Sequence, residues 1–219
     1  MKVISFSLWG DDPKYNVGLL KNVELAAKLF PNWECWIYFS RFDTPPAVLQ
    51  LIVDQFPNVT FKPQVHPGDW RGMFWRFEPI LHDEVEVMIS RDCDSRLSLR
   101  EKAAVDQWLE SDKSFHCMRD HIWHNRPVLG GMWGAKKDFL PNFNDLMSNA
   151  VKEDRWQTDQ DFLNDIIWPL VEDNAMQHDS YYRHMWGGMP FPTPRQNLQF
   201  VGEIIDENEN PNWEHRRML

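Results

Sequence analysis

Apolar residues follow two alternating patterns along the first ninety positions of the chain. Short runs of apolar, branched and aromatic residues, typical of buried strands, occupy residues 2–9, 33–40, 59–64 and 85–90. Segments with apolar residues at helical spacing lie between these runs, at residues 14–30, 44–56 and 71–83. Strands that alternate with helices predict an α/β fold with a mostly parallel central sheet flanked by helices.

Residues with known helix-capping preferences mark the ends of several helices. Thr44 is suited to the N-cap of one helix, because prolines follow it in the first turn. Pro79 is expected to stop the helix at 71–83. Ser98 and Glu101 form a capping-box pair at the start of a further helix. These signals agree with the spacing of the apolar residues.

The second half of the chain is less regular. It is expected to contain helices at 98–110 and 158–171, strands at 114–118 and 128–135, and a short strand near the end. No repeat or linker divides the sequence, which predicts a single domain over residues 1–205 and a frayed acidic tail over 206–219.

Composition narrows the possible functions. The chain has 219 residues, of which 42% are hydrophobic, and no apolar run is long enough to span a bilayer. We therefore expect a soluble cytoplasmic protein. The formal net charge of −10 argues against a nucleic-acid partner. The three cysteines, Cys35, Cys93 and Cys117, have no close spacing and are expected to be buried free thiols.

Two carboxylates follow the strand at 85–90. Asp92 and Asp94 are separated by one residue, so in an extended chain both side chains point the same way. Hard oxygen ligands suit Mn²⁺ or Mg²⁺, which keep positions for water and phosphate. Ligands bind outside the carboxyl ends of strands in such sheets. The pair therefore suggests a metal–diphosphate site, although a solvated turn would have the same sequence.

Three arginines surround this pair. Arg76 precedes the strand, and Arg91 and Arg96 flank the two aspartates. Guanidinium groups hold phosphate oxygens through paired hydrogen bonds. Each arginine could instead form a surface ion pair, which is common in an acidic protein.

The order of several motifs resembles a known family. "MFWRFEPI", "EVMISRDCDSRL", "MRDHIWHNRPVLGGMWGAK", "TDQDFL" and the late "DSYY…PFPTPR" together resemble the sugar-nucleotide glycosyltransferases of the GT-A fold. They are most similar to the small DxD domains of large DNA viruses of algae. The resemblance implies a GT-A, Rossmann-like fold, a nucleotide-sugar donor such as a UDP-sugar, a glycan acceptor and a Mn²⁺ or Mg²⁺ cofactor. A viral origin would place the protein in the host cytoplasm.

The resemblance also implies roles for particular residues. The base and ribose of the donor would contact four residues at the end of the first strand and beyond it, namely Leu8, Trp9, Gly10 and Tyr15. Arg76 would contact the donor sugar or phosphate, with Arg91 beside the metal ligands Asp92 and Asp94.

Later residues would surround the donor sugar in the same comparison. Asp120 and His121 would line the sugar pocket, and Gly130 and Gly131 would let the backbone come close to the sugar. Asp159 or Asp161 would lie at the reacting face, although acidic residues in a first helical turn also favour the helix dipole.

The third metal ligand is left open. His184 resembles a late metal-binding histidine of some retaining enzymes, and His178 competes for that role. Arg195 would close over the diphosphate or pair with the acidic tail. The "DQD" segment favours retention of the anomeric configuration, whereas Asp120 could serve as an inverting base.

Two other classes of function remain. A sugar-nucleotide nucleotidyltransferase would carry a glycine-rich basic loop after the first strand, and "SLWGDDPKYN" lacks one. Twelve tryptophans would suit a non-catalytic carbohydrate-binding protein, but such modules are usually all-β. Tryptophans 70, 75, 123, 133 and 186 lie near the motifs and are candidates for stacking on sugars.

Overall fold

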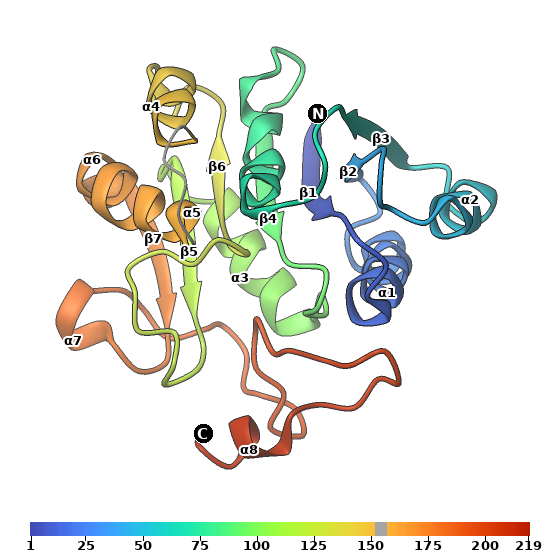
Figure 1. Cartoon of the computed structure of the whole chain (residues 1–219). Coiled ribbons are helices and arrows are strands. Elements are labelled where there is room, and N and C mark those ends of the chain that lie inside the picture. The colour runs from blue at the N-terminus through green and yellow to red at the C-terminus, as the bar shows by residue number, and fades with distance from the viewer. Residues whose placement is uncertain (152–156) are drawn as a thin grey trace.

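A central sheet organises the computed structural model, which describes residues 1–151 and 157–219. Within these residues, seven strands pair in the order β3-β2-β1-β4-β6-β5-β7 (Figure 1). Their bounds are β1 Lys2–Leu8, β2 Glu34–Ser40, β3 Val59–Gln64, β4 Val87–Arg91, β5 Phe115–Arg119, β6 Met132–Lys136 and β7 Ala175–Asp179. Strands β3, β2, β1 and β4 are parallel neighbours, as are β5 and β7, whereas β6 is antiparallel to β4 and β5. The predicted mostly parallel α/β sheet is confirmed.

Helical segments cover the sheet. The α-helices are α1 Pro13–Leu29, α2 Pro46–Gln55, α3 Leu99–Leu109, α4 Phe143–Ala150, α5 Thr158–Asp161, α6 Trp168–Val171, α7 Arg183–Trp186 and α8 Trp213–Arg216. The other helical segments are the 3₁₀ helices η1 Trp70–Leu81 and η3 Glu172–Asn174, and the π-helix η2 Phe162–Ile167. None of the helices in the described part of the chain combines the length and the apolar character needed to cross a membrane.

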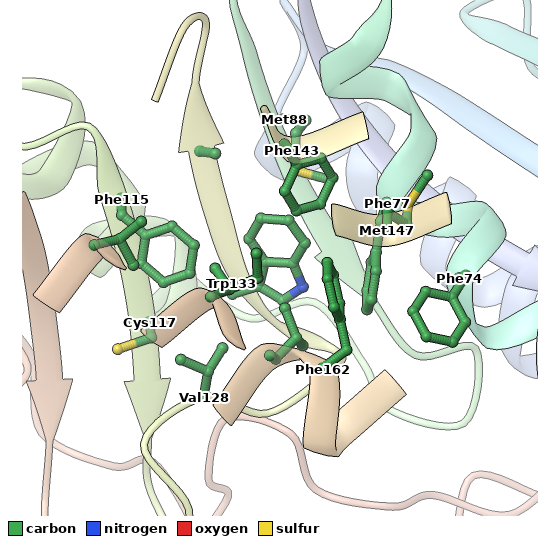
Figure 2. Close-up of a cluster of buried hydrophobic side chains, with 14 of the residues drawn as sticks. Phe74, Phe77, Met88, Phe115, Cys117, Val128, Trp133, Phe143, Met147 and Phe162 are labelled. Atoms are coloured by element: carbon green, nitrogen blue, oxygen red, sulfur yellow. The ribbon is translucent and has the colours of Figure 1, made fainter. Parts of the chain in front are cut away.

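Two apolar clusters hold these helices to the sheet. One cluster joins α1 and α3 to the strands through residues such as Leu19, Val23 and Trp108. The other gathers aromatic side chains from η1, β6, α4 and η2 around Trp133 (Figure 2). The Trp133 ring lies 5.1 Å from the Phe77 ring and 5.4 Å from the Phe115 ring, between centroids. Trp133 is therefore a core residue and not the sugar platform suggested by its position in the sequence.

Two predicted helices have unusual hydrogen bonding. The helix expected at 71–83 is the 3₁₀ helix η1, Trp70–Leu81, which ends two residues after Pro79, close to the expected stop. The predicted helix at 158–171 is helical throughout but changes to π spacing in η2, where Trp168 N–H donates to the Leu163 carbonyl. Pro169 follows directly, and its ring would crowd an α-helical carbonyl.

The C-terminal segment is anchored and not frayed. The red trace in Figure 1 lies beyond the arrowheads of β1 and β7, at the carboxyl ends of these strands. Arg216 pairs with the buried Glu203, and Glu209 pairs with Arg96 at 2.8 Å. Ile205 N–H donates to the Asp94 carbonyl at 2.8 Å. Acidic residues of this segment therefore have arginine partners in the structure, which sequence proximity did not reveal.

Candidate functional site

A cleft lies beyond β1 and β4, where the strand order reverses and open α/β sheets bind their ligands. Two adjoining cavities, of about 490 Å³ and 410 Å³, form this cleft. Their linings have six residues in common: Tyr15, Trp70, Met73, Arg76, Asp92 and Asp94. The predicted DxD pair and Arg76 thus stand at the junction of the two cavities.

The two aspartates of the pair are in different surroundings. The Asp92 side chain is 40% exposed and pairs with Arg76. The Asp94 side chain is 15% exposed, and its Oδ2 lies 3.3 Å from Lys14 Nζ. Burial, and then the neighbouring Asp92, raise the pKa of Asp94, while Lys14 lowers it. The two cations hold both carboxylates near the junction.

Hydrogen bonds from helix α1 fix the turn that carries Asp92 and Asp94. The Asn22 side chain on α1 donates to the carbonyls of Cys93 and Ser95, at 3.3 Å and 2.8 Å, and accepts from Leu97 N–H. A Cβ at Gly18 would lie 2.1 Å from the Cys93 carbonyl oxygen, so only glycine allows α1 to come this close. The positions of Asp92 and Asp94 are therefore set by α1.

Arg76 connects the pair to the start of α5. It is 3% exposed, and its guanidinium contacts Asp92 and, at 3.3 Å, Asp159 Oδ2. Burial raises the pKa of Asp159, and the Arg76 charge opposes that rise. The predicted residues Arg76, Asp92 and Asp159 are brought together across 83 positions of sequence.

Both predicted glycines pass very close to these charged groups. A Cβ at Gly131 would lie 2.0 Å from Asp92 Oδ2, and one at Gly130 would lie 2.5 Å from Arg76 Nη2. The close approach therefore involves protein side chains. Contact of these glycines with a donor sugar stays a prediction.

The smaller cavity contains three of the four residues expected at the donor base. Trp9, Gly10 and Tyr15 line it, whereas Leu8 is buried in the core beneath it. Asp43 shapes this end by accepting from the N–H groups of Gly10 and Gly68. Asp43 was not predicted as a site residue, although a polar residue just after the carboxyl end of a parallel strand, here β2, is a signal of a ligand site.

The larger cavity is lined by Asp159 and by residues not predicted from the sequence, including Gln160, Arg126 and His124. Arg126 Nη1 lies 2.9 Å from Asp161 Oδ1. Asp161 does not line either cavity. Of the two acidic residues in "DQD", Asp159 is thus the one placed at the cleft.

Two of the three predicted arginines face away from the cleft. Arg91 is 3% exposed, pairs with Glu101 and donates to the carbonyls of Ser90 and Trp133. Arg96 donates to backbone carbonyls of its own turn and pairs with Glu209. The charges of Arg91 and Arg96 are paired with glutamates of the protein, so a direct contact of either arginine with phosphate does not fit this structure.

Asp120 and His121 are also displaced from the predicted pocket lining. Asp120 is fully buried, with its carboxylate bound by Arg100, Arg195 and Ser180. Burial alone would raise the pKa of Asp120, but hydrogen bonds from Arg100, Ser180 and Val201 N–H lower it below its usual range. An anchored carboxylate with these partners is a structural group and not a free base. His121 is held by Trp123 N–H and the His215 carbonyl.

The histidines proposed as a third metal ligand lie elsewhere. His184 is exposed on α7 and lines neither cavity. His178 is fully buried and hydrogen-bonds to His116 and Gln107, both at 2.9 Å. Among the described residues, no group of three or more His, Cys, Asp or Glu side chains is arranged to hold a metal ion. Asp92 and Asp94 still fit Mn²⁺ or Mg²⁺, since such ions take one or two carboxylates plus phosphate and water.

Comparison by sequence finds no relatives: no protein-family model matches the chain, and no curated protein is similar to it. Comparison by structure finds similar proteins. The fold is similar to a glycosyltransferase involved in glycosylation of the major capsid of PBCV-1, at a TM-score of 0.54 and 12% identity over 89% of this chain and 94% of the other. It is also similar to the mannosyltransferase PcManGT from Pyrobaculum calidifontis, solved with GDP-Man and Mn²⁺, at 0.55 and 13% identity over 90% and 58%.

A nucleotidyltransferase has the same architecture. The 4-diphosphocytidyl-2C-methyl-D-erythritol synthase from Anaerococcus prevotii matches at a TM-score of 0.50 and 9% identity, over 88% of this chain and 92% of the other. At such identities the likeness shows the fold alone. The GT-A-like fold expected from the ordered motifs is therefore confirmed, and the activity has to be argued from the cleft.

Proposed function

We propose that this chain is a metal-dependent glycosyltransferase that moves a sugar from a nucleotide-diphosphate donor, a UDP-sugar, to a hydroxyl group of a glycan acceptor. The junction of the two cavities carries the proposal. A donor has a nucleoside at one end, a sugar at the other and a diphosphate between them. The cleft has a cavity on each side of Arg76, Asp92 and Asp94, which matches that order.

The smaller cavity suits the nucleoside. Trp9, Tyr15 and Trp70 supply aromatic surface for a base, and Gly10 leaves room beside them. Asp11 and Asp12, at the same end, are suited to accept hydrogen bonds from ribose hydroxyls. The base itself is assigned to uracil by the motif resemblance, and the experiment below tests that assignment.

Asp92 and Asp94 would hold Mn²⁺ or Mg²⁺, with diphosphate oxygens and water completing its shell. When bound, this ion would supply positive charge for the diphosphate leaving group. Arg76 orients Asp92 and Asp159 together, because its guanidinium is buried between them. The Mn²⁺ bound by the mannosyltransferase with the same fold supports this assignment.

The larger cavity suits the donor sugar and the incoming acceptor. Asp159 and Gln160 bring polar groups that can hydrogen-bond sugar hydroxyls. Trp123 lines the outer part of this cavity and is 52% exposed, so its ring can stack on a glycan. Arg126, paired with Asp161, lies at the same rim.

A nucleotidyltransferase is the second candidate, because an enzyme of that class has the same fold. The loop between β1 and α1 has one glycine, Gly10, and no basic residue, and Lys14 in the first turn of α1 is paired with Asp94. A triphosphate-binding loop would need more backbone N–H groups free for phosphate. The two candidates differ in product: a glycosyltransferase releases a nucleoside diphosphate, and a nucleotidyltransferase releases pyrophosphate.

Thermal unfolding with nucleotides tests the proposal. UDP, GDP, CMP and dTDP are each added with and without Mn²⁺ to the wild type, to Asp94→Ala and to the exposed control Asp54→Ala. A ligand at about 100 times its dissociation constant stabilises a fold by about 2.7 kcal/mol, which is easily measured. We expect a shift with UDP that needs Mn²⁺, is lost in Asp94→Ala and persists in Asp54→Ala. A folded protein that responds to no nucleotide would disprove the donor site and favour a glycan-binding role.

A further inference from the structure

Lys14 makes an ion pair with Asp94 that a bound metal ion would have to break. Its Nζ lies 3.3 Å from Asp94 Oδ2 and 4.2 Å from the centre of the Tyr15 ring. Lys14 lies in the first turn of α1, where its N–H is capped by Asp12. The backbone is thus fixed, and the ammonium reaches Asp94 on a long flexible stem.

Three carboxylates of the cleft, Asp92, Asp94 and Asp159, are paired with two cations near the junction of the cavities. Arg76 forms ion pairs with both Asp92 and Asp159, and Lys14 forms one with Asp94. The Arg76 side chain is 4% exposed and held between Asp92 and Asp159, whereas that of Lys14 is 29% exposed. Of these two cations, Lys14 is therefore the one that can leave its carboxylate without moving packed structure.

A divalent cation on Asp94 would repel the ammonium that now occupies the same carboxylate. The ammonium would then move toward the junction of the two cavities, because Tyr15 and Asp94, which it contacts, line both of them. The proposed diphosphate would lie at this point. Phosphate oxygens would replace the Asp94 oxygen as the partner of Lys14, and the stem has the length for such a change.

We propose that Lys14 is a placeholder cation: it competes with the metal for Asp94 in the free protein and transfers to the donor diphosphate when metal and donor bind. This inference rests on the proposed function. It assigns Lys14 two opposite effects, because the same ammonium weakens binding of the metal alone and strengthens binding of the nucleotide with metal. A residue that only stabilised the fold would weaken both.

Lys14→Met tests this inference, since it removes the charge and keeps a similar stem. Calorimetry measures the dissociation constant of Mn²⁺ alone, and then that of UDP at saturating Mn²⁺. An ion pair that solvent reaches, as it reaches Lys14, is worth up to about fivefold in an equilibrium constant. We expect Lys14→Met to bind Mn²⁺ roughly two- to fivefold tighter and UDP roughly two- to fivefold weaker. Lys14→Arg retains the charge and should keep both constants close to those of the wild type.

Lys21→Met is the matched control, because Lys21 lies on the same helix and pairs only with the exposed Glu24 among the ion pairs of the described residues. It should change neither constant. Unchanged or weaker Mn²⁺ binding by Lys14→Met would overturn the placeholder role, as would unchanged UDP binding, while leaving the glycosyltransferase proposal intact. A wild type that binds no UDP in the presence of Mn²⁺ would overturn both.

Discussion

Arg76 Nη2 lies 3.3 Å from Asp159 Oδ2, and both side chains are 4% exposed. This contact joins η1 to α5 inside the protein, and Arg76 also holds Asp92. Removing one partner of a buried pair leaves an uncompensated charge, which typically costs about 3–5 kcal/mol. The contact is therefore as important for the fold as for the cleft.

Arg76→Met should accordingly lower the free energy of unfolding by about 3–5 kcal/mol in urea denaturation. Arg71→Met on the same helix is the control. Arg71 pairs with the partly exposed Asp69, so its loss should cost less than about 1 kcal/mol. Equal effects of the two substitutions would show that Arg76 does not bear a buried charge pair.

Gly131→Ala should impair metal and nucleotide binding through Asp92. The new methyl group would meet Asp92 Oδ2 at 2.0 Å, so the carboxylate has to move. We expect most of the Mn²⁺-dependent thermal shift with UDP to be lost. If the glycine acts only through Asp92, adding Gly131→Ala to Asp92→Ala should bring no further loss of binding. Additive losses would contradict this coupling.

Two tryptophans should respond in opposite ways to substitution. Trp133 is fully buried among aromatic rings (Figure 2), so Trp133→Ala should destabilise the fold by about 3–5 kcal/mol. Trp123 is 52% exposed at the cleft, and Trp123→Ala should cost less than about 1 kcal/mol while weakening acceptor binding. Urea denaturation and acceptor-dependent turnover measure the two effects. A large stability loss in Trp123→Ala would remove it as an acceptor platform.

Stability should depend on pH through Glu78. Burial raises the pKa of Glu78 to about 7, although Lys62 and Gln64 lower it, and the usual value is 4.5. Because the folded pKa is the higher one, the carboxyl's contribution to stability is full below about pH 4.5 and is lost as pH rises through 7. Glu78→Gln, which cannot ionise, should be more stable than the wild type at pH 8, with no such advantage at pH 4.5. Thermal unfolding at both values measures the difference, and a pH-independent difference would contradict the shift.

Local sequence patterns predicted much of the fold. The alternation of strands and helices over the first ninety residues and the turn after β4 follow from the spacing of neighbouring residues. Strand β7 was missed because its sequence, "AMQHD", is polar at positions that are buried by long-range contacts. Periodicity cannot report burial that comes from elsewhere in the chain.

The cleft was predicted less completely, for the same reason. Adjacency to the aspartates suggested phosphate contacts for Arg91 and Arg96, but the partners of these arginines, Glu101 and Glu209, lie 10 and 113 positions away. Lys14 was not predicted as a site residue, because only the fold brings it to Asp94. The direction of a charged side chain depends on partners that a single sequence does not identify.

The anchored C-terminal segment has a consequence for the order in which the protein is made. The turn that holds Asp94 receives a hydrogen bond from Ile205, and Arg96 beside it receives its carboxylate from Glu209. The sheet can assemble while translation continues, since all of its strands precede residue 180. The cleft gains these two supports only after residue 209 has been made, so its final shape depends on chain that is synthesised after the whole sheet.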